Sequence, residues 1–245
     1  MEFQGKVALV TGGTRGIGAA IVRLFAERGA DVAFTYARSD EAAQDLVGEL
    51  GASGVKVLAI KADSRDLAAV RAAVAQTARE LGRVDILVNS AGVFPAGPVE
   101  DATLDEISDT LAIHAGAVFA ASQAALPHMG SGGRIISIGS CFAQRVPYGG
   151  VTLYAMSKSA LIGFTKGLAR EVGERGITVN IVDPGSTDTD MNPANGPMVA
   201  AELELMAIKR YAQPREIAAA VGYLASPGSQ FITGASLAID GGFTA

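Results

Sequence analysis

The chain has 245 residues, of which 49% are hydrophobic and 18% are charged, and its formal net charge at pH 7 is −5. This composition argues against a disordered chain and fits one large domain, or two small ones, with a sizeable core. The acidic balance lacks the basic footprint of a nucleic-acid binder, and the single cysteine, Cys141, excludes an intrachain disulfide and argues against a cysteine-based zinc site.

The first residues, MEFQGKVALVTGG, lack the basic start and apolar core of a signal peptide. The longest apolar stretches are broken by Gly, Ser or a charge well before the ~20 residues that a membrane span requires. With the lone cysteine, these features predict a soluble protein of the cytoplasm.

Short β-branched runs alternate along the chain with longer segments of helical periodicity. Strands are predicted over 6–11, 31–36, 56–62, 85–89, 134–139, 178–183 and 236–240, and helices over 17–28, 41–50, 67–81 and 154–174, among others. Continuous apolar strands that alternate with helices predict a parallel sheet covered on both faces, in the doubly wound Rossmann-like α/β class, with about seven strands. No repeat or linker divides the chain, so a single domain over 1–245 is predicted.

The segment between the first strand and the first helix is rich in glycine. Gly12, Gly16 and Gly18 are spaced G-x-x-x-G-x-G, which differs from the commonest dinucleotide fingerprint but follows the same physics. Glycines let the backbone approach a pyrophosphate, and the helix N-terminus supplies free N–H groups. Candidate cofactor residues here are also Thr14, Arg15 and Ile17; the alternative is a tight turn without a ligand.

The residues at the end of the second strand indicate whether the protein prefers NAD(H) or NADP(H). An NAD site would place a carboxylate near this position, but the sequence has Tyr36, Arg38 and Ser39. Arg38 and Arg15 could clamp a ribose 2′-phosphate, because guanidinium groups match phosphate oxygens. The alternative is two solvated surface arginines. We predict NADP(H) over NAD(H).

Polar residues also follow the third and fourth strands. Asp63, followed by Ser64, could accept a hydrogen bond from adenine, or could cap a helix, a role for which Asp66 competes. Asn89 is either a structural bridge between strands or a neighbour of the cofactor. The carboxyl ends of strands are where ligands of such sheets bind, so Ala91 and Gly92 join the candidates.

The fifth strand and the helix after it carry the candidate catalytic groups. Tyr154 and Lys158 are four residues apart and share a helix face, and an ammonium near the phenol would lower its pKa from about 10. Ser140 could hold a carbonyl oxygen. By themselves, an amphipathic helix and a turn serine explain these residues equally well. The stretch 184–198 is rich in Gly, Pro, Asn and Asp, and a loop this long is usually functional, often a lid.

Together, TGGTRGIG, NSAG, Ser140, Tyr154-x-x-x-Lys158 and PG-x-x-x-T from residue 184 resemble the short-chain dehydrogenase/reductase family over essentially the whole chain. The likeness is greatest to its 3-oxoacyl-carrier-protein reductase-like ketoreductases. The resemblance implies a cofactor half over 1–130 and a catalytic and substrate half over 131–245. It also implies a homotetramer.

The resemblance assigns roles by position. Tyr154 would exchange the proton with the carbonyl oxygen, Lys158 would bind the nicotinamide ribose and depress the Tyr154 pKa, and Ser140 would polarise the carbonyl. The nicotinamide would lie beside Pro184, Gly185, Thr187 and Thr189. This implies a reversible, NADPH-dependent carbonyl reductase without a metal. The alternative is a catalytically weakened protein of the same fold that binds a cofactor or nucleotide ligand and has a regulatory role.

His114 departs from the family pattern. Relatives carry an asparagine at this position, which holds a water that links the lysine to a proton relay. A neutral imidazole could bridge the same water or approach Lys158 directly, so we expect a proton relay and a lowered His114 pKa. The alternatives are a core histidine and a lost relay with impaired catalysis.

Candidate residues for a substrate pocket are aromatic, aliphatic and sulfur-containing: Phe94, Phe142, Val146, Tyr148, Met191, Met198 and Met206. Ordinary core packing is the alternative for each of them. An apolar and adaptable cleft would suit a ketone with hydrophobic substituents. Arg145 could recognise an anionic tail at the entrance, although an exposed arginine needs no such explanation.

Overall fold

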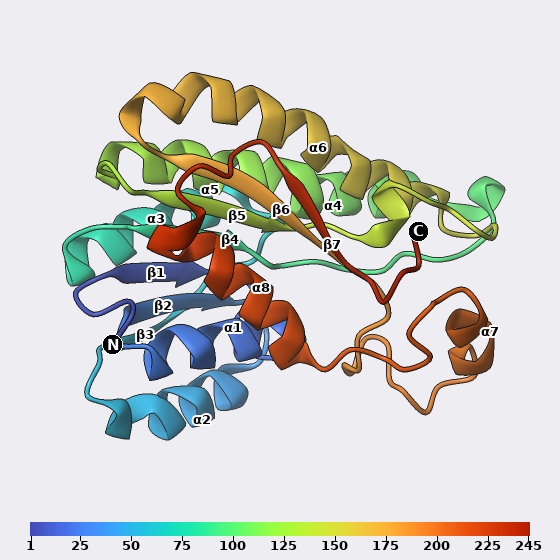
Figure 1. Ribbon diagram of the computed structural model, residues 1–245, viewed down its shortest axis with the longest axis horizontal. Helices are drawn as coiled ribbons and strands as arrows, with labels where there is room; N and C mark the ends of the chain where they lie inside the picture. Colours follow the sequence, from blue (N-terminus) through green and yellow to red (C-terminus); the bar gives the residue numbers. More distant parts are fainter.

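A computed structural model describes residues 1–245, which form one seven-stranded parallel sheet with helices on both faces (Figure 1). The strand order is β3-β2-β1-β4-β5-β6-β7. The strands are β1 (Val7–Val10), β2 (Asp31–Tyr36), β3 (Val57–Lys61), β4 (Ile86–Asn89), β5 (Arg134–Ile138), β6 (Thr178–Pro184) and β7 (Ser236–Ile239). The fold class and all seven strands predicted from the sequence are confirmed.

The helices lie in two layers. Helices α1 (Gly16–Glu27), α2 (Asp40–Leu50) and α8 (Pro214–Ala225) cover one face, and α3 (Leu67–Leu81), α4 (Leu104–Leu111), α5 (Ala117–Ala125) and α6 (Thr152–Val172) cover the other (Figure 1). Successive residues of a strand alternate between the layers: Ala8 and Val10 pack in the cluster that includes α1 and α8, and Leu9 packs in the cluster that includes α3 and α5. Both faces are therefore buried, which explains the continuous apolar runs.

The strand order reverses direction between β1 and β4. From β1 the chain adds β2 and β3 on one side of this strand, and then adds β4 to β7 on its other side. A crevice therefore opens between β1 and β4, outside the carboxyl ends of these strands. In Figure 1 this edge faces the C-terminus and the short helix α7 (Val199–Glu204). The loop predicted over 184–198 follows β6 directly and leads into α7.

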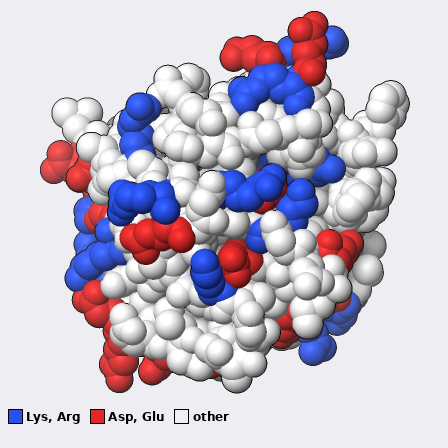
Figure 2. All heavy atoms as spheres, turned by 90° about the vertical axis from the view of Figure 1, so that its left-hand side faces the viewer, with Lys and Arg blue, Asp and Glu red and all other residues white.

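The opposite edge, where the strands begin, carries mixed charges. Figure 2 shows lysines and arginines interspersed with aspartates and glutamates on this face, without a field of one sign. Several of the charges are paired, as in the contact of Arg28 with Glu2 at 2.7 Å. No helix of the protein combines the length and the apolar character needed to cross a bilayer.

The connection between β4 and β5 contains an irregular helical turn. Helix α4 passes into a π-helical turn, Ala112–Gly116, before the chain continues as α5. His114 lies in this turn, with its side chain directed toward α6. π-turns interrupt α-helices rarely and often at functional sites, which makes this turn a structural marker of the crevice.

Candidate functional site

A cleft of about 830 Å3 opens at the carboxyl edge of the sheet. It is lined by the glycine loop, the end of β2, the loops after β4 and β5, the start of α6, and the loop after β6. The cleft therefore brings together most of the predicted site residues: Gly12, Thr14, Arg15, Gly16, Ile17, Gly18, Tyr36, Arg38, Ser39, Ala91, Gly92, Phe94, Ser140, Phe142, Tyr148, Tyr154, Lys158, Pro184, Gly185, Thr187, Thr189, Met191 and Met198.

The glycine loop is compact because backbone lies against backbone. A Cβ at Gly18 would be 2.1 Å from the carbonyl oxygen of Gly12, and one at Gly12, whose φ is +69°, would be 2.8 Å from Ala91 Cα. The Thr35 hydroxyl accepts the Gly12 N–H at 3.1 Å and fixes the loop against β2. The start of α1, at Gly16, faces the cleft without a side-chain cap, so its free N–H groups are available to an anion.

The two candidate phosphate-binding arginines have different surroundings. The Arg15 guanidinium pairs with the Asp190 carboxylate in the loop after β6, and Gly16 lies directly under Thr189 in the same loop. Arg38 is exposed at the rim of the cleft, near Asp63. Arg38 is thus the freer of the two cations, whereas Arg15 already links the glycine loop to the loop after β6.

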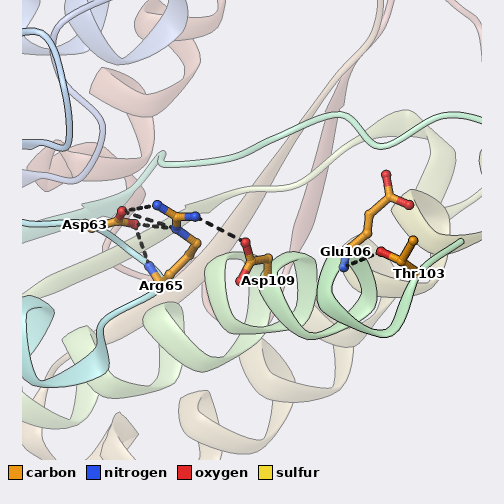
Figure 3. Close-up of polar contacts among 5 residues, drawn as sticks. All are labelled: Asp63, Arg65, Thr103, Glu106 and Asp109. Carbon is orange, nitrogen blue, oxygen red and sulfur yellow. Dashed lines mark hydrogen bonds and ion pairs between the residues drawn. The ribbon is translucent and has the colours of Figure 1, made fainter.

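Asp63 does not line the cleft, in contrast to the prediction. Arg65 holds its carboxylate through the backbone N–H at 2.9 Å and the guanidinium at 2.6 Å, and lies between Asp63 and Asp109 of α4 (Figure 3). The Arg65 hydrogen bonds keep the pKa of Asp63 below its usual value.

The Thr103 hydroxyl caps the start of α4 by accepting the Glu106 N–H, also drawn in Figure 3.

Two further candidates on this side, Ser64 and Asn89, do not line the cleft. Ser64 is buried beside Asp63 and does not line the cleft, and Asp66, not Asp63, caps α3 by accepting the Ala68 and Ala69 N–H groups. Asn89 is buried behind the cleft, with its amide nitrogen 3.5 Å from the Ser122 hydroxyl of α5. The Asn89 side-chain oxygen is buried without a hydrogen-bond partner, so both roles considered for Asn89, structural bridge and cofactor neighbour, stay predictions.

Ser140, Tyr154 and Lys158 converge at the floor of the cleft. The Lys158 ammonium donates to the Ile138 carbonyl at 2.9 Å and lies 5.8 Å from the centre of the Tyr154 ring. Burial lowers the pKa of Lys158 to about 8, with the Asp183 carboxylate working against this shift. The Ser140 backbone N–H donates to Asp183 at 2.9 Å, which fixes the end of β5.

The pKa of Tyr154 moves in the direction opposite to the prediction. Burial raises the pKa of Tyr154 to about 12, and a hydrogen bond with the Ser140 side chain offsets only part of the shift. The Lys158 ammonium is bonded to a backbone carbonyl, not to the phenol, so it does not overcome the loss of hydration. Tyr154 is therefore a protonated phenol at neutral pH.

His114 has both ring nitrogens occupied by protein groups. The Val93 N–H donates to Nε2 at 3.0 Å, and Nδ1 is 2.8 Å from the Ser157 hydroxyl, which donates onward to the Tyr154 carbonyl at 2.7 Å. Nε2 must accept, so the proton is on Nδ1. The imidazole is 1% exposed and makes no hydrogen bond with Lys158.

These contacts correct the role predicted for His114. Neither ring nitrogen is free to hold a relay water, and the imidazole does not line the cleft. The side chain instead joins three segments: the π-turn, the loop after β4 and the second turn of α6. The predicted neutral form is confirmed, because burial and the Lys158 charge lower the pKa of His114 to about 2.

Aromatic rings form the side of the cleft next to Tyr154. Its ring meets Phe94 edge-to-face at 4.7 Å between centroids and Phe142 at 6.1 Å. Phe142 also contacts Tyr148 at 5.6 Å and Phe243 at 5.6 Å. An apolar substituent would pack well against this cluster.

Two predicted pocket residues lie outside the cleft, and the lining also includes residues that were not predicted, among them Glu202 and Phe243. Val146 is exposed on the surface, and Met206 is buried behind the wall in a small cluster with Cys141 and Phe243. Glu202 of α7 accepts hydrogen bonds from Ser186, Asn192 and Tyr211 and so fastens α7 over the cleft. No motif marks Glu202 or Phe243 in the sequence. No group of three His, Cys, Asp or Glu side chains is placed to hold a metal ion.

Comparisons with known proteins agree with this architecture. A family model described as enoyl-(acyl carrier protein) reductase matches residues 12–244. The chain is 49% identical to the cyclic-di-GMP-binding biofilm dispersal mediator protein of Escherichia coli K12, over 99% of both chains. It is 42% identical to 3-oxoacyl-[acyl-carrier-protein] reductase of Vibrio cholerae, over 99% of this chain and 98% of that protein.

Among solved structures, a short-chain dehydrogenase from Burkholderia cenocepacia, crystallised in complex with NADP, superposes with a TM-score of 0.99 at 55% identity and covers all of both chains. Each of these three proteins matches 99% or more of this chain. The chain belongs to the short-chain dehydrogenase/reductase family.

Proposed function

We propose that the protein is an NADPH-dependent reductase of ketones and aldehydes that also runs in reverse as an alcohol dehydrogenase. The observation that supports this most strongly is that Ser140, Tyr154 and Lys158 meet in the same cleft as the glycine loop and the open start of α1. One end of the cleft thus suits a pyrophosphate and the other suits a carbonyl.

The NADP(H) cofactor is favoured by the residues at the ribose end and by a relative. The three residues directly after β2, Ala37, Arg38 and Ser39, include no carboxylate, and Arg38 stands free at the rim. The similar Burkholderia protein was crystallised with NADP. When bound, NADPH supplies the hydride that forms the new bond to the carbonyl carbon.

The residues of the chain supply position and a proton. As the carbonyl carbon gains the hydride, the C=O π electrons move to oxygen, and this oxygen takes the proton from Tyr154 Oη. Ser140, next to the phenol, donates a hydrogen bond to the same oxygen and polarises it. Tyr154 is left as a phenolate, which the nearby Lys158 ammonium stabilises until the phenolate recovers a proton from solvent.

A second function is suggested by a relative. The Escherichia coli protein at 49% identity is named for binding cyclic-di-GMP, and a nucleotide ligand would meet the same cleft with Arg15 and Arg38 at one end. On this alternative the chain would be a regulatory binding protein with weak catalysis. Ser140, Tyr154 and Lys158 are all present in the cleft, which favours the reductase.

The experiment that separates the two functions follows NADPH absorbance at 340 nm against a panel of aryl ketones, alkyl ketones and β-keto esters or thioesters. Turnover with part of the panel supports the reductase. Tight binding of NADPH or cyclic-di-GMP without turnover of any carbonyl would favour the regulatory protein.

The preference for NADPH should depend on Arg38. We expect Arg38→Ala to weaken NADPH binding roughly tenfold or more, the value of a charge-assisted hydrogen bond to phosphate, and to leave NADH binding unchanged. Isothermal titration with both cofactors measures this. Arg79→Ala on the exposed face of α3 is the matched control. An equal loss for NADPH and NADH would mean that Arg38 does not read the 2′-phosphate.

The homotetramer and the cytoplasmic location belong to the same proposal. A groove between α5 and α6 is lined by Phe119, Phe164, Leu126 and Leu168, and Phe119 is 58% exposed. Such apolar surface on a soluble protein supports helix packing between copies.

A further inference from the structure

The five residues 240–244, here called the hook, follow β7 and fold back against the cleft. In Figure 1 the C-terminus lies beyond β7, on the side to which the strands point. The Asp240 carboxylate accepts the Gly242 N–H at 2.9 Å and the Thr244 N–H at 3.0 Å, and the Gly241 carbonyl accepts the Ile208 N–H at 2.8 Å. These hydrogen bonds therefore fix the conformation of the hook.

These contacts press one side chain of the hook into the cleft wall. Phe243 is 3% exposed and lines the cleft, so the small part of its surface that is accessible faces the cleft. Its ring packs edge-to-face on Phe142 at 5.6 Å, and Phe142 in turn packs on Tyr154. Phe243 thus lies two rings away from the phenol, where the substituents of a carbonyl would extend.

Arg145, in the loop after β5, holds the hook from the other side. Its guanidinium donates to the Phe243 carbonyl and lies 5.5 Å from the centre of the Phe243 ring. Arg145 takes part in no ion pair, and the contacts of its guanidinium in the fold are those with the carbonyl and the ring of Phe243. The hydrogen bond to the carbonyl uses one guanidinium nitrogen, so the anionic-tail role considered for Arg145 stays a prediction.

We propose that Phe243 sets the largest carbonyl substituent that the cleft accepts, and that Arg145 is the positioning residue that keeps Phe243 in place. The proposal rests on the proposed reductase function and adds its specificity determinant. Phe142 cannot play this part alone, because it contacts Tyr154 directly and its loss would disturb the phenol. Phe243 can recede without touching Tyr154.

The test compares Phe243→Ala, Phe243→Leu and Arg145→Gln with the wild type. The substrates are acetone, acetophenone and 2-acetylnaphthalene, methyl ketones of increasing bulk. In Phe243→Ala, we expect kcat/KM for 2-acetylnaphthalene relative to acetone to rise roughly tenfold or more, a change of the size that pocket-volume changes produce. Phe243→Leu and Arg145→Gln should give smaller rises in the same direction, with NADPH affinity unchanged.

Phe231→Ala is the matched control, since Phe231 is 100% exposed and outside the cleft. If Phe243→Ala fails to fold, Phe243→Leu and Arg145→Gln decide the result. If the wild type and the variants all reduce ketones, but the ratio of kcat/KM values for 2-acetylnaphthalene and acetone is the same in each, the role of Phe243 is overturned and the proposed function stands. A wild type that reduces no carbonyl would overturn this inference together with the proposed function.

Discussion

Tyr154→Phe should lower kcat for carbonyl reduction by roughly 10²–10⁴-fold, the range for loss of a general acid. The phenylalanine ring fills the same space between Phe94 and Phe142, so the cleft should keep its shape. NADPH affinity should therefore stay within about twofold of the wild type, since only the proton donor has been removed. Stopped-flow turnover and isothermal titration on the same preparation measure both quantities.

The pH dependence of the two directions adds a second check. Because the pKa of Tyr154 is raised to about 12, the phenol is protonated through neutral pH and ready to give its proton in reduction. Alcohol oxidation needs the phenolate, so its rate should rise as the pH increases. Tyr223→Phe, on the exposed side of α8, is the control for a lost hydroxyl. Undiminished turnover by Tyr154→Phe would remove the phenol from the mechanism.

The elements and the cofactor end were predictable because their signals are local. A buried parallel strand must be apolar on both faces, and the glycines of the loop are needed where Gly18 approaches the Gly12 carbonyl at a distance that excludes a side chain. Tyr154 and Lys158 are one helical turn apart, so their shared face follows from spacing alone. Such features require no knowledge of which distant segments meet.

The site features that the sequence does not reveal depend on contacts and burial that exist only in the folded protein. Asp63 was assigned to adenine, but Arg65, two residues away, folds back and takes its carboxylate. Phe243 lies in the cleft wall, in a hook that Asp240 and Arg145 hold, and no periodicity in the sequence reveals these contacts. The pKa of Tyr154 depends on burial more than on its neighbour in the helix, and burial is a property of the whole fold.

The second large effect that we expect comes from His114, and it concerns the stability of the folded protein at acidic pH. The pKa of His114 falls from the ordinary 6.5 to about 2 in the folded protein, because burial and the Lys158 charge disfavour the imidazolium. Below pH 6.5 the unfolded chain takes up a proton that the folded chain refuses. The free energy of unfolding therefore falls as the pH falls, by about 1.4 kcal/mol per unit, until the pH nears 2.

Urea unfolding at pH 7.5 and 4.5 measures this contribution. At pH 4.5 the wild type should have lost about 3 kcal/mol through His114, and His114→Asn should not show this loss. His128→Asn is the matched control, because His128 is exposed and far from the cleft. Since the carboxylates titrate alike in all three proteins, the difference between them isolates the imidazole. Parallel losses in wild type and His114→Asn would contradict the buried, neutral histidine.

Kinetics then separate positioning from proton transfer. His114 fixes Ser157, whose hydroxyl bonds the Tyr154 carbonyl, so Ser157→Ala and His114→Ala should lower kcat by similar factors and leave the shape of the pH–rate profile unchanged. His114→Asn can still accept the Val93 N–H and should recover part of the loss. A relay histidine would behave differently: its removal would shift the pH profile, and Ser157→Ala would not reproduce the defect. The Nδ1–H tautomer, held between a donor and an acceptor, leaves no path for a proton through the ring, so we expect the first pattern.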